Sequence, residues 1–98
     1  MDMNKLTSIQ EMANGNPGAI TFLAEAYRLD PFGAEDAMQR MRDLKIVGDK
    51  LYMLWSDCCN RDTELTLKMM QKLPDDQIIY YLNYENGRGL KFSCDDLK

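Results

Sequence analysis

The sequence contains no histidine, which removes the side chain that most often serves as a base or a zinc ligand near neutral pH. It has three cysteines, Cys58, Cys59 and Cys94, of which two are adjacent. An odd number without a Cys-x-x-Cys spacing is typical neither of a disulfide framework nor of a zinc site. We therefore expect buried thiols in a reducing compartment, with no metal and no cofactor.

Long apolar runs are also missing. The longest, Leu51 to Trp55, is far shorter than the ~20 residues that a membrane-spanning helix needs. No apolar segment of a secretory signal follows the N-terminus. The 98 residues suit one domain, 1–98, in which 90–98 is a candidate tail. We expect a soluble, cytoplasmic protein that does not contact a membrane.

Basic residues are outnumbered, 12 against 16 acidic ones, and the net charge is −4. A surface that follows the phosphates of a nucleic acid needs a basic stripe, so we expect no binding to nucleic-acid polymers. The acidic residues are dispersed along the chain, which also disfavours a mimic of DNA.

The sequence does contain clear signals for the beginnings and ends of helices. Asn16-Pro17 and Asp30-Pro31 each place a capping side chain before a proline, the pattern that begins a helix. Apolar residues at helical spacing predict helices over about 4–12, 17–29, 31–44, 50–59, 64–73 and 78–84. The predicted fold class is all-α: a compact, irregular bundle of five or six short helices. Leu90 to Phe92 is predicted to be a short strand or a docked tail.

Several packing details follow from the same spacing. The buried residues of helix 17–29 are expected to be Ile20, Leu23, Ala24 and Tyr27. Four methionines are expected in the core: Met38, Met41, Met69 and Met70. Asp36 and Arg40 are expected to pair on an outer face, and Asn86 to Gly89 to end the last helix.

The loop from Asn14 to Ala19 is one candidate ligand site. Gly15 permits a positive φ angle, Asn16 caps the next helix, and Gly18 opens the backbone to close approach. The N–H groups at such a helix start can bind a phosphate or a carboxylate. The loop lacks the lysine of a P-loop, so a plain helix–helix turn is the alternative.

A second candidate ligand site comprises Tyr52, Trp55, Asp57 and Arg61. Two aromatic rings three residues apart, beside an i,i+4 carboxylate and guanidinium, suit a stacked nucleobase with a polar edge. The alternative is that Trp55 anchors the core and that Asp57 and Arg61 stabilise a helix.

A candidate partner surface comprises Tyr80, Tyr81, Tyr84 and Arg88. Three tyrosines on one short helix cannot all point inward, so at least one is expected to face solvent or a partner protein.

The stretch Asn14-Gly15-Asn16-Pro17-Gly18-Ala19, with Leu54-Trp55-Ser56-Asp57-Cys58-Cys59 downstream, resembles a family of small uncharacterised proteins from Firmicutes and their phages. The resemblance covers roughly residues 6–73 and supplies no activity. It implies a bacterial or phage setting, and hence the cytoplasm of a bacterial host.

Without a histidine to activate a nucleophile, we predict that the chain is not an enzyme. The favoured hypothesis is a phage- or prophage-type binding protein that sequesters a small phosphate-bearing or nucleotide ligand, such as a host immune signal. The alternative is a protein-interaction module that inhibits or scaffolds a host or phage protein. Association into a homo-oligomer fits either hypothesis.

Overall fold

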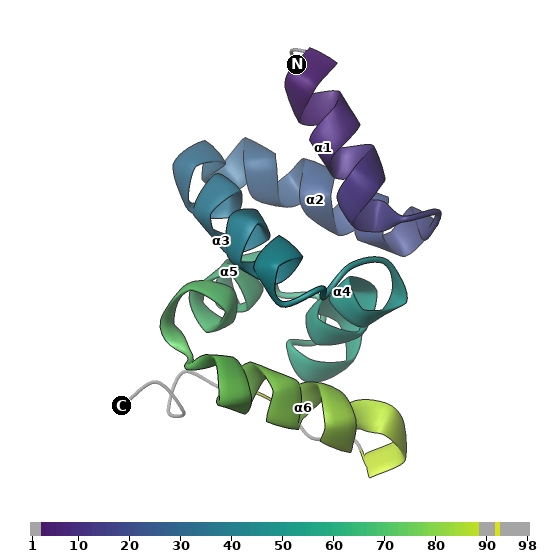
Figure 1. Ribbon diagram of the computed structural model, residues 1–98, viewed down its shortest axis with the longest axis vertical. Helices are drawn as coiled ribbons and strands as arrows, with labels where there is room; N and C mark the ends of the chain where they lie inside the picture. Colours follow the sequence, from purple (N-terminus) through teal and green to yellow (C-terminus); the bar gives the residue numbers. More distant parts are fainter. Residues whose placement is uncertain (1–2, 89–91, 93–98) are drawn as a thin grey trace.

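The computed structural model describes residues 3–88 and Phe92, including the side chains of 7–83 and Phe92. This part of the chain forms an all-α bundle, as predicted, and contains no strand (Figure 1). Its elements are α1 (Met3–Ala13), α2 (Pro17–Leu29), α3 (Pro31–Asp43), α4 (Asp49–Met53), a π-helical turn η1 (Leu54–Cys58), α5 (Thr63–Lys72) and α6 (Asp75–Arg88).

Three of the helices begin at a capping side chain. Asn16 Oδ1 accepts from the Ala19 N–H at 3.1 Å ahead of α2, and Asp30 Oδ1 accepts from the Gly33 N–H at 3.0 Å ahead of α3. Asp62 caps α5 in the same way. Each such cap is worth about 1 kcal/mol, so local sequence alone sets these helix starts.

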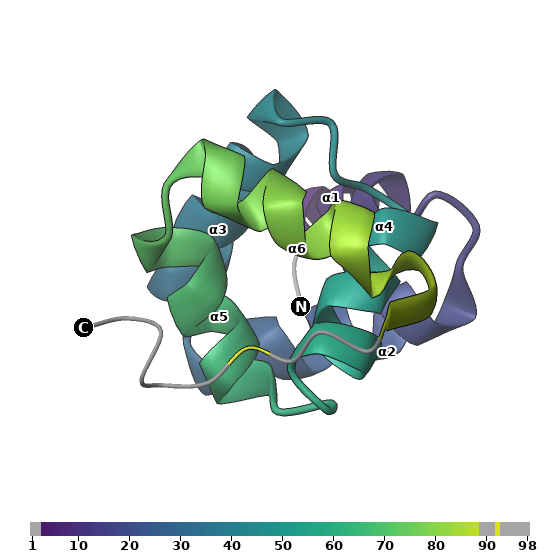
Figure 2. The same ribbon diagram turned by 90° about the horizontal axis from the view of Figure 1, so that it is seen from below.

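Helix α2 is the centre of the bundle and packs against α1, α3, α4 and α5 (Figures 1 and 2). Its buried residues are Ala19, Phe22, Leu23, Ala26 and Tyr27. The predicted inner face was wrong at Ile20, which is 43% exposed, and at Ala24, which is also exposed. Both stripes have helical spacing, and the structure buries the one that carries Phe22 because the neighbouring helices cover that side.

The core methionines behave as predicted. Met38, Met41, Met69 and Met70 are all fully buried. Their unbranched thioether chains adapt to the irregular space between short helices that cross at different angles.

The single helix expected over 50–59 is two elements, α4 and η1. The Cys59 N–H donates to the Leu54 carbonyl at 3.1 Å, five residues back, which widens the last turn into a π-helix. Leu51, Leu54, Trp55 and Cys58, which lie at helical spacing on one face, are all buried. No pattern in the sequence signals the wider turn.

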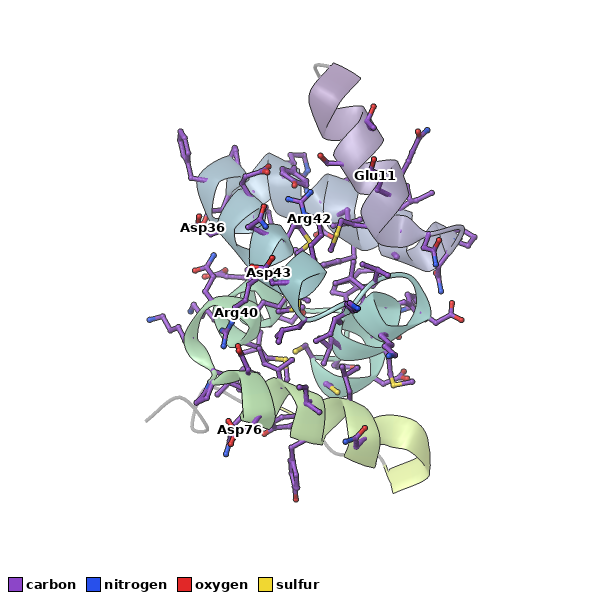
Figure 3. All side chains as sticks on the ribbon, viewed as in Figure 1. Glu11, Asp36, Arg40, Arg42, Asp43 and Asp76 are labelled. Carbon is purple, nitrogen blue, oxygen red and sulfur yellow. The ribbon has the colours of Figure 1, made fainter. Side chains whose placement is uncertain are left out.

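The expected pair between Asp36 and Arg40 is wrong. Arg40 extends from α3 to the beginning of α6, where its Nη2 donates to Asp75 Oδ1 at 2.7 Å. Its Nη1 donates to the Met70 carbonyl at 2.9 Å. Figure 3 shows Arg40 between α3 and α6, and Asp36 on the outer side of α3. The planar guanidinium can hold two acceptors at once, so it joins three helices instead of supporting one.

The end of α6 also differs from the prediction. The helix continues through Asn86 and Gly87 to Arg88, because an Asn-Gly pair permits a left-handed ending without requiring one. Of the expected tail, Phe92 is buried and its N–H donates to the Cys58 carbonyl at 2.8 Å. Residues 90, 91 and 93–98 of that tail lie outside the described part of the chain.

Tyr27 joins α2 to α3. Its side chain is buried and its hydroxyl donates to Glu35 Oε2 at 3.1 Å. Burial, and then the charge and the hydrogen bond of Glu35, raise the pKa of Tyr27 from 10.0 to about 12.

We expect the stability of the fold to decrease as the pH rises from 10.0 to about 12. In this interval the unfolded phenol ionises while the folded one stays protonated, so unfolding releases a proton. A shift of this size corresponds to roughly 2–3 kcal/mol. Urea unfolding at a series of pH values, compared between wild type and Tyr27→Phe, isolates the contribution because the other groups titrate in both proteins. A wild-type minus variant difference that does not change with pH would contradict the assignment.

Candidate functional site

The two ligand-site candidates from the sequence lie side by side in the structure. A Cβ atom added to Gly18 would lie 2.2 Å from Cε1 of Tyr52, so the tyrosine ring rests directly on the glycine. Asn16 Nδ2 donates to Asp49 Oδ1 at 2.7 Å. We call Asn16, Gly18, Asp49, Tyr52 and Arg61 the loop–Tyr52 cluster.

The loop reaches α2 through two left-handed residues. Asn14 has a φ of 45° and Gly15 a φ of 85°, in the region that only glycine and, less readily, asparagine adopt at low cost. Ala19 follows at the first turn of α2 and is fully buried. The loop therefore forms a helix–helix turn, as the alternative hypothesis states. This geometry does not depend on a ligand.

Tyr52 has an altered acidity in this cluster. Hydrogen bonding by Ser56, and then by Arg61, lowers the pKa of Tyr52 below its usual 10.0. Arg61 Nη2 donates to the Tyr52 hydroxyl at 3.3 Å, and its guanidinium carbon lies 5.9 Å from the centre of the Trp55 ring. The charge of Asp57, a half-buried residue of η1, raises the Tyr52 pKa and so opposes this shift.

Trp55 is an anchor of the core. It is 5% exposed, its ring centre lies 5.6 Å from that of Phe22, and its Nε1 donates to Thr63 Oγ1 at 3.0 Å. Arg61 lies over the ring from outside. The indole therefore offers almost no surface on which a nucleobase could stack.

The start of α2 is partly satisfied by the protein itself. The side chain of Asn16 caps the Ala19 N–H, and the carboxylate of Asp49 holds the amide of Asn16. An anion at this position would be attracted by the guanidinium of Arg61 and repelled by the carboxylate of Asp49. Among residues 3–88 and 92, no three histidine, cysteine or acidic side chains form a group that could hold a metal ion.

The tyrosines of α6 divide between surface and core. Tyr80 is 47% exposed, which confirms that at least one of them faces solvent. Tyr81 is buried, with its ring centre 5.7 Å from that of Phe92. The side chains of Tyr84 and Arg88 lie outside the described residues.

Among the described side chains, the largest apolar exposure lies outside the sites that the sequence predicted. Phe32, in the first turn of α3, is 88% exposed, and Leu29, at the end of α2, is 52% exposed. Phe32 lies outside the buried stripe of α3. This position relative to the apolar face is the feature of the sequence that indicates its exposure.

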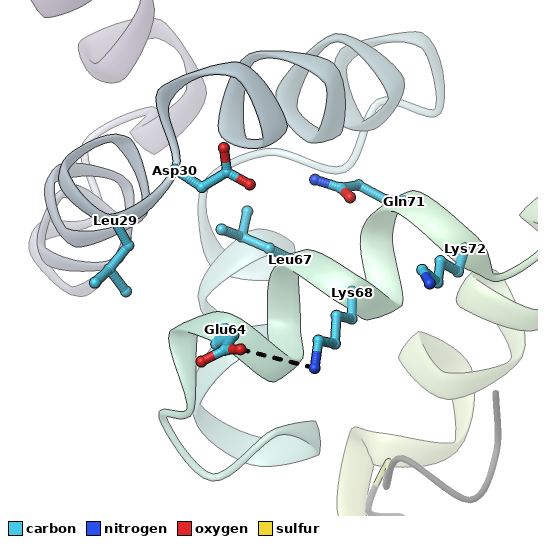
Figure 4. Close-up of a pocket in the computed structure, with 7 residues that line it drawn as sticks. All are labelled: Leu29, Asp30, Glu64, Leu67, Lys68, Gln71 and Lys72. Atoms are coloured by element: carbon cyan, nitrogen blue, oxygen red, sulfur yellow. Dashed lines mark ion pairs between the residues drawn. The ribbon is translucent and has the colours of Figure 1, made fainter.

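A groove of about 510 Å³ lies between the α2–α3 corner and α5 (Figure 4). Leu29 lines it, whereas Phe32 lies in the same corner and is not part of the lining. Leu29 supplies most of its exposed apolar surface, since Leu67 is only 5% exposed, and charged side chains of both signs surround them. We call it the corner groove; its lining residues are Leu29, Asp30, Glu64, Leu67, Lys68, Gln71 and Lys72.

No family model, curated protein or solved structure matches this chain. Within the described ranges, no helix has both the length and the apolar character to cross a membrane. The function of the cluster and the groove must therefore be argued from their own chemistry.

We expect Gly18→Ala to lower the free energy of unfolding by about 1–3 kcal/mol, because the added methyl group overlaps the Tyr52 ring. In a Tyr52→Ala background the same change should cost nothing, since alanine is the better helix former. Thermal and urea unfolding of wild type, Gly18→Ala, Tyr52→Ala and the double variant measures the coupling free energy between the two positions.

Gly15→Ala is the matched control. Its φ of 85° makes a side chain unfavourable, yet nothing lies within 4 Å of the added atom. Gly15→Ala should lower the free energy of unfolding by the same amount in wild type and in the Tyr52→Ala background. A Gly18→Ala cost that survives removal of the tyrosine ring would show that the contact does not hold the loop.

Proposed function

We propose that this chain is a non-catalytic protein-binding module whose binding surface is the corner groove with Phe32 beside it. The observation that carries the proposal is the 88% exposure of Phe32. A phenylalanine ring in water contributes nothing to the core, and together with the exposed Leu29 it offers apolar surface that contact with another molecule would bury.

The surroundings of Phe32 have the composition of a protein interface. Leu29, three residues away, is 52% exposed and also lines the groove. Charged side chains surround this apolar centre, as in a typical interface with an apolar core and a polar rim. Aromatic residues beside a groove commonly supply most of the binding energy.

The setting that we propose is the cytoplasm of a bacterial host, where a phage or prophage protein of this kind inhibits or scaffolds a host or phage protein. The resemblance of the loop 14–19 to proteins from Firmicutes and their phages supports this setting. The absence of histidine from the sequence supports a binding role over a catalytic one.

We expect Phe32→Ser to leave the free energy of unfolding within about 0.5 kcal/mol of wild type, because the ring makes little contact with the fold. Binding to a partner should weaken by roughly 30-fold or more, the effect of losing an anchor residue. A partner captured from the bacterial host is purified and titrated calorimetrically against both proteins.

Ile20→Ser is the matched control, because Ile20 is an exposed apolar side chain on the same pair of helices outside the groove. It should bind the partner like wild type. Equal binding by Phe32→Ser and wild type, or equal losses in both variants, would reject the groove as the binding surface.

A second candidate function is sequestration of a small phosphate-bearing ligand, such as a nucleotide immune signal of the host. One observation favours it: the loop and the Tyr52 helix lie in contact, with the guanidinium of Arg61 beside them. The carboxylate of Asp49 at the same place opposes the binding of an anion.

Thermal unfolding with inorganic phosphate, and with a panel of nucleotides including cyclic dinucleotides, tests this second function. A true ligand at a hundredfold excess over its dissociation constant should stabilise the fold by about 2.7 kcal/mol. Arg61→Gln should abolish the shift and Asp49→Asn should increase it, whereas Arg28→Gln, an exposed arginine elsewhere, should not alter it. The absence of a shift with every compound would exclude the candidate.

A further inference from the structure

We infer that Cys59 and Met69 form a binding site for a soft monovalent metal ion, Cu(I). A thiolate together with a thioether is a ligand set that selects Cu(I) over harder divalent ions. The site lies where the end of η1 meets α5. It shares no residue with the corner groove and does not include Phe32, so it is independent of the proposed function.

Two sulfur atoms from separate elements meet inside the bundle at this point. The Cys59 thiol donates to Sδ of Met69 at 3.8 Å, although the two residues are ten positions apart. Cys59 is 2% exposed and Met69 is fully buried. A thiol is a weak donor and a thioether a weak acceptor, so the contact contributes little as a hydrogen bond. It does place two soft donor atoms next to each other.

The spacing of the two sulfurs suits a bridging metal ion. With metal–sulfur bonds of about 2.3 Å, a separation of 3.8 Å corresponds to an angle of roughly 110° at the metal. The metal takes the place of the thiol proton, which is directed at Met69. The Sγ–H bond of Cys59 breaks and its proton passes to solvent, the thiolate forms the Sγ–Cu bond, and Met69 adds a lone pair from its sulfur. Copper remains Cu(I) throughout.

The backbone around Cys59 holds the two ligands in place. The Cys59 N–H closes the π-helical turn on the Leu54 carbonyl at 3.1 Å. Asn60 and Arg61 follow with φ angles of 54° and 61°, and the chain then enters α5, which carries Met69 back to Cys59. Non-glycine residues adopt positive φ angles only at a cost, so the folded protein fixes this loop. Ligands that are already in position lower the cost of binding.

A cavity beside the two sulfurs gives the metal a route to the site. It has a volume of about 550 Å³, and Cys59 and Cys58 both belong to its lining. Asp62 is the one charged residue among the described residues of this lining, and its carboxylate favours the entry of a cation. The other lining residues are Asn60, Leu65 and Phe92.

The charge of the site also suits Cu(I). One thiolate and one monovalent cation give a neutral complex, because the thioether of Met69 carries no charge, and a neutral complex is tolerated in a buried position. Zinc requires three or four nitrogen, oxygen or thiolate ligands. No group of three histidine, cysteine or acidic side chains in residues 3–88 and 92 provides them. The spacing of the cysteines in the sequence does not indicate the site, since Met69 approaches Cys59 only in the folded chain.

Anaerobic titration of the reduced full chain with Cu(I), in competition with the chelator bicinchoninic acid, is the test, and native mass spectrometry gives the stoichiometry. Wild type should bind one Cu(I). Met69→Leu removes the thioether with little change in volume. Binding should weaken by roughly tenfold or more, since the loss of even an outer partner of a metal ligand costs about 10–100-fold. Cys59→Ala should abolish the one-to-one complex.

Met70→Leu is the matched control, because Met70 is the next residue of α5 and is also fully buried. It should bind Cu(I) like wild type. Cys58 and Cys94 remain in every variant, so non-specific binding to thiols would give Met69→Leu the affinity of wild type and overturn the inference. A wild type that does not compete with the chelator, or equal losses in Met69→Leu and Met70→Leu, would overturn it as well. Phe32→Ser should bind Cu(I) normally, which separates this result from the test of the corner groove.

Discussion

The whole bundle depends on the burial of the inner face of α2. Within the described part of the chain no α-helix exceeds 14 residues, and helices this short are marginal in water without tertiary contacts. Helix α2 supplies those contacts to four neighbours, because Ala19 and Ala26 let backbones approach while Phe22 and Leu23 fill the space between them. All four residues are fully buried. Removal of this face would leave α1, α3, α4 and α5 without a common surface.

The position of α2 also explains why the loop–Tyr52 cluster exists. The helix begins soon after α1 ends and packs against α4, and the Tyr52 ring lies against it at Gly18. Asn16 satisfies the first turn and Asp49 holds Asn16, so the polar groups at this helix start are largely used within the protein. The contacts that bring the two candidate sites together are therefore contacts that stabilise the fold.

Local chemistry predicted the fold, and tertiary context decided where the predictions were wrong. Asn16-Pro17 and Asp30-Pro31 located two helix starts to the residue, because a cap and a proline act within one turn. Ile20 was wrongly placed inside, since periodicity alone cannot choose between adjacent apolar stripes. Arg40 pairs with Asp75 instead of Asp36, because only the folded chain brings α6 close to α3. The proximity of the loop to Tyr52, and the groove between α5 and the α2–α3 corner, required the structure for the same reason.

The two candidate sites differ in how far the protein satisfies them by itself. At the cluster, Trp55 is buried, Tyr52 covers Gly18 and Arg61 donates to Tyr52, so a ligand would compete with existing contacts. At the α2–α3 corner, the Phe32 ring remains in water, and Leu29, which lines the groove, is 52% exposed. Burying that surface costs no internal hydrogen bond and gains the hydrophobic free energy of a large ring, about 1.5–3 kcal/mol per side chain. The balance of these terms favours the groove over the cluster as the proposed binding surface, and the contacts of the cluster stabilise the fold.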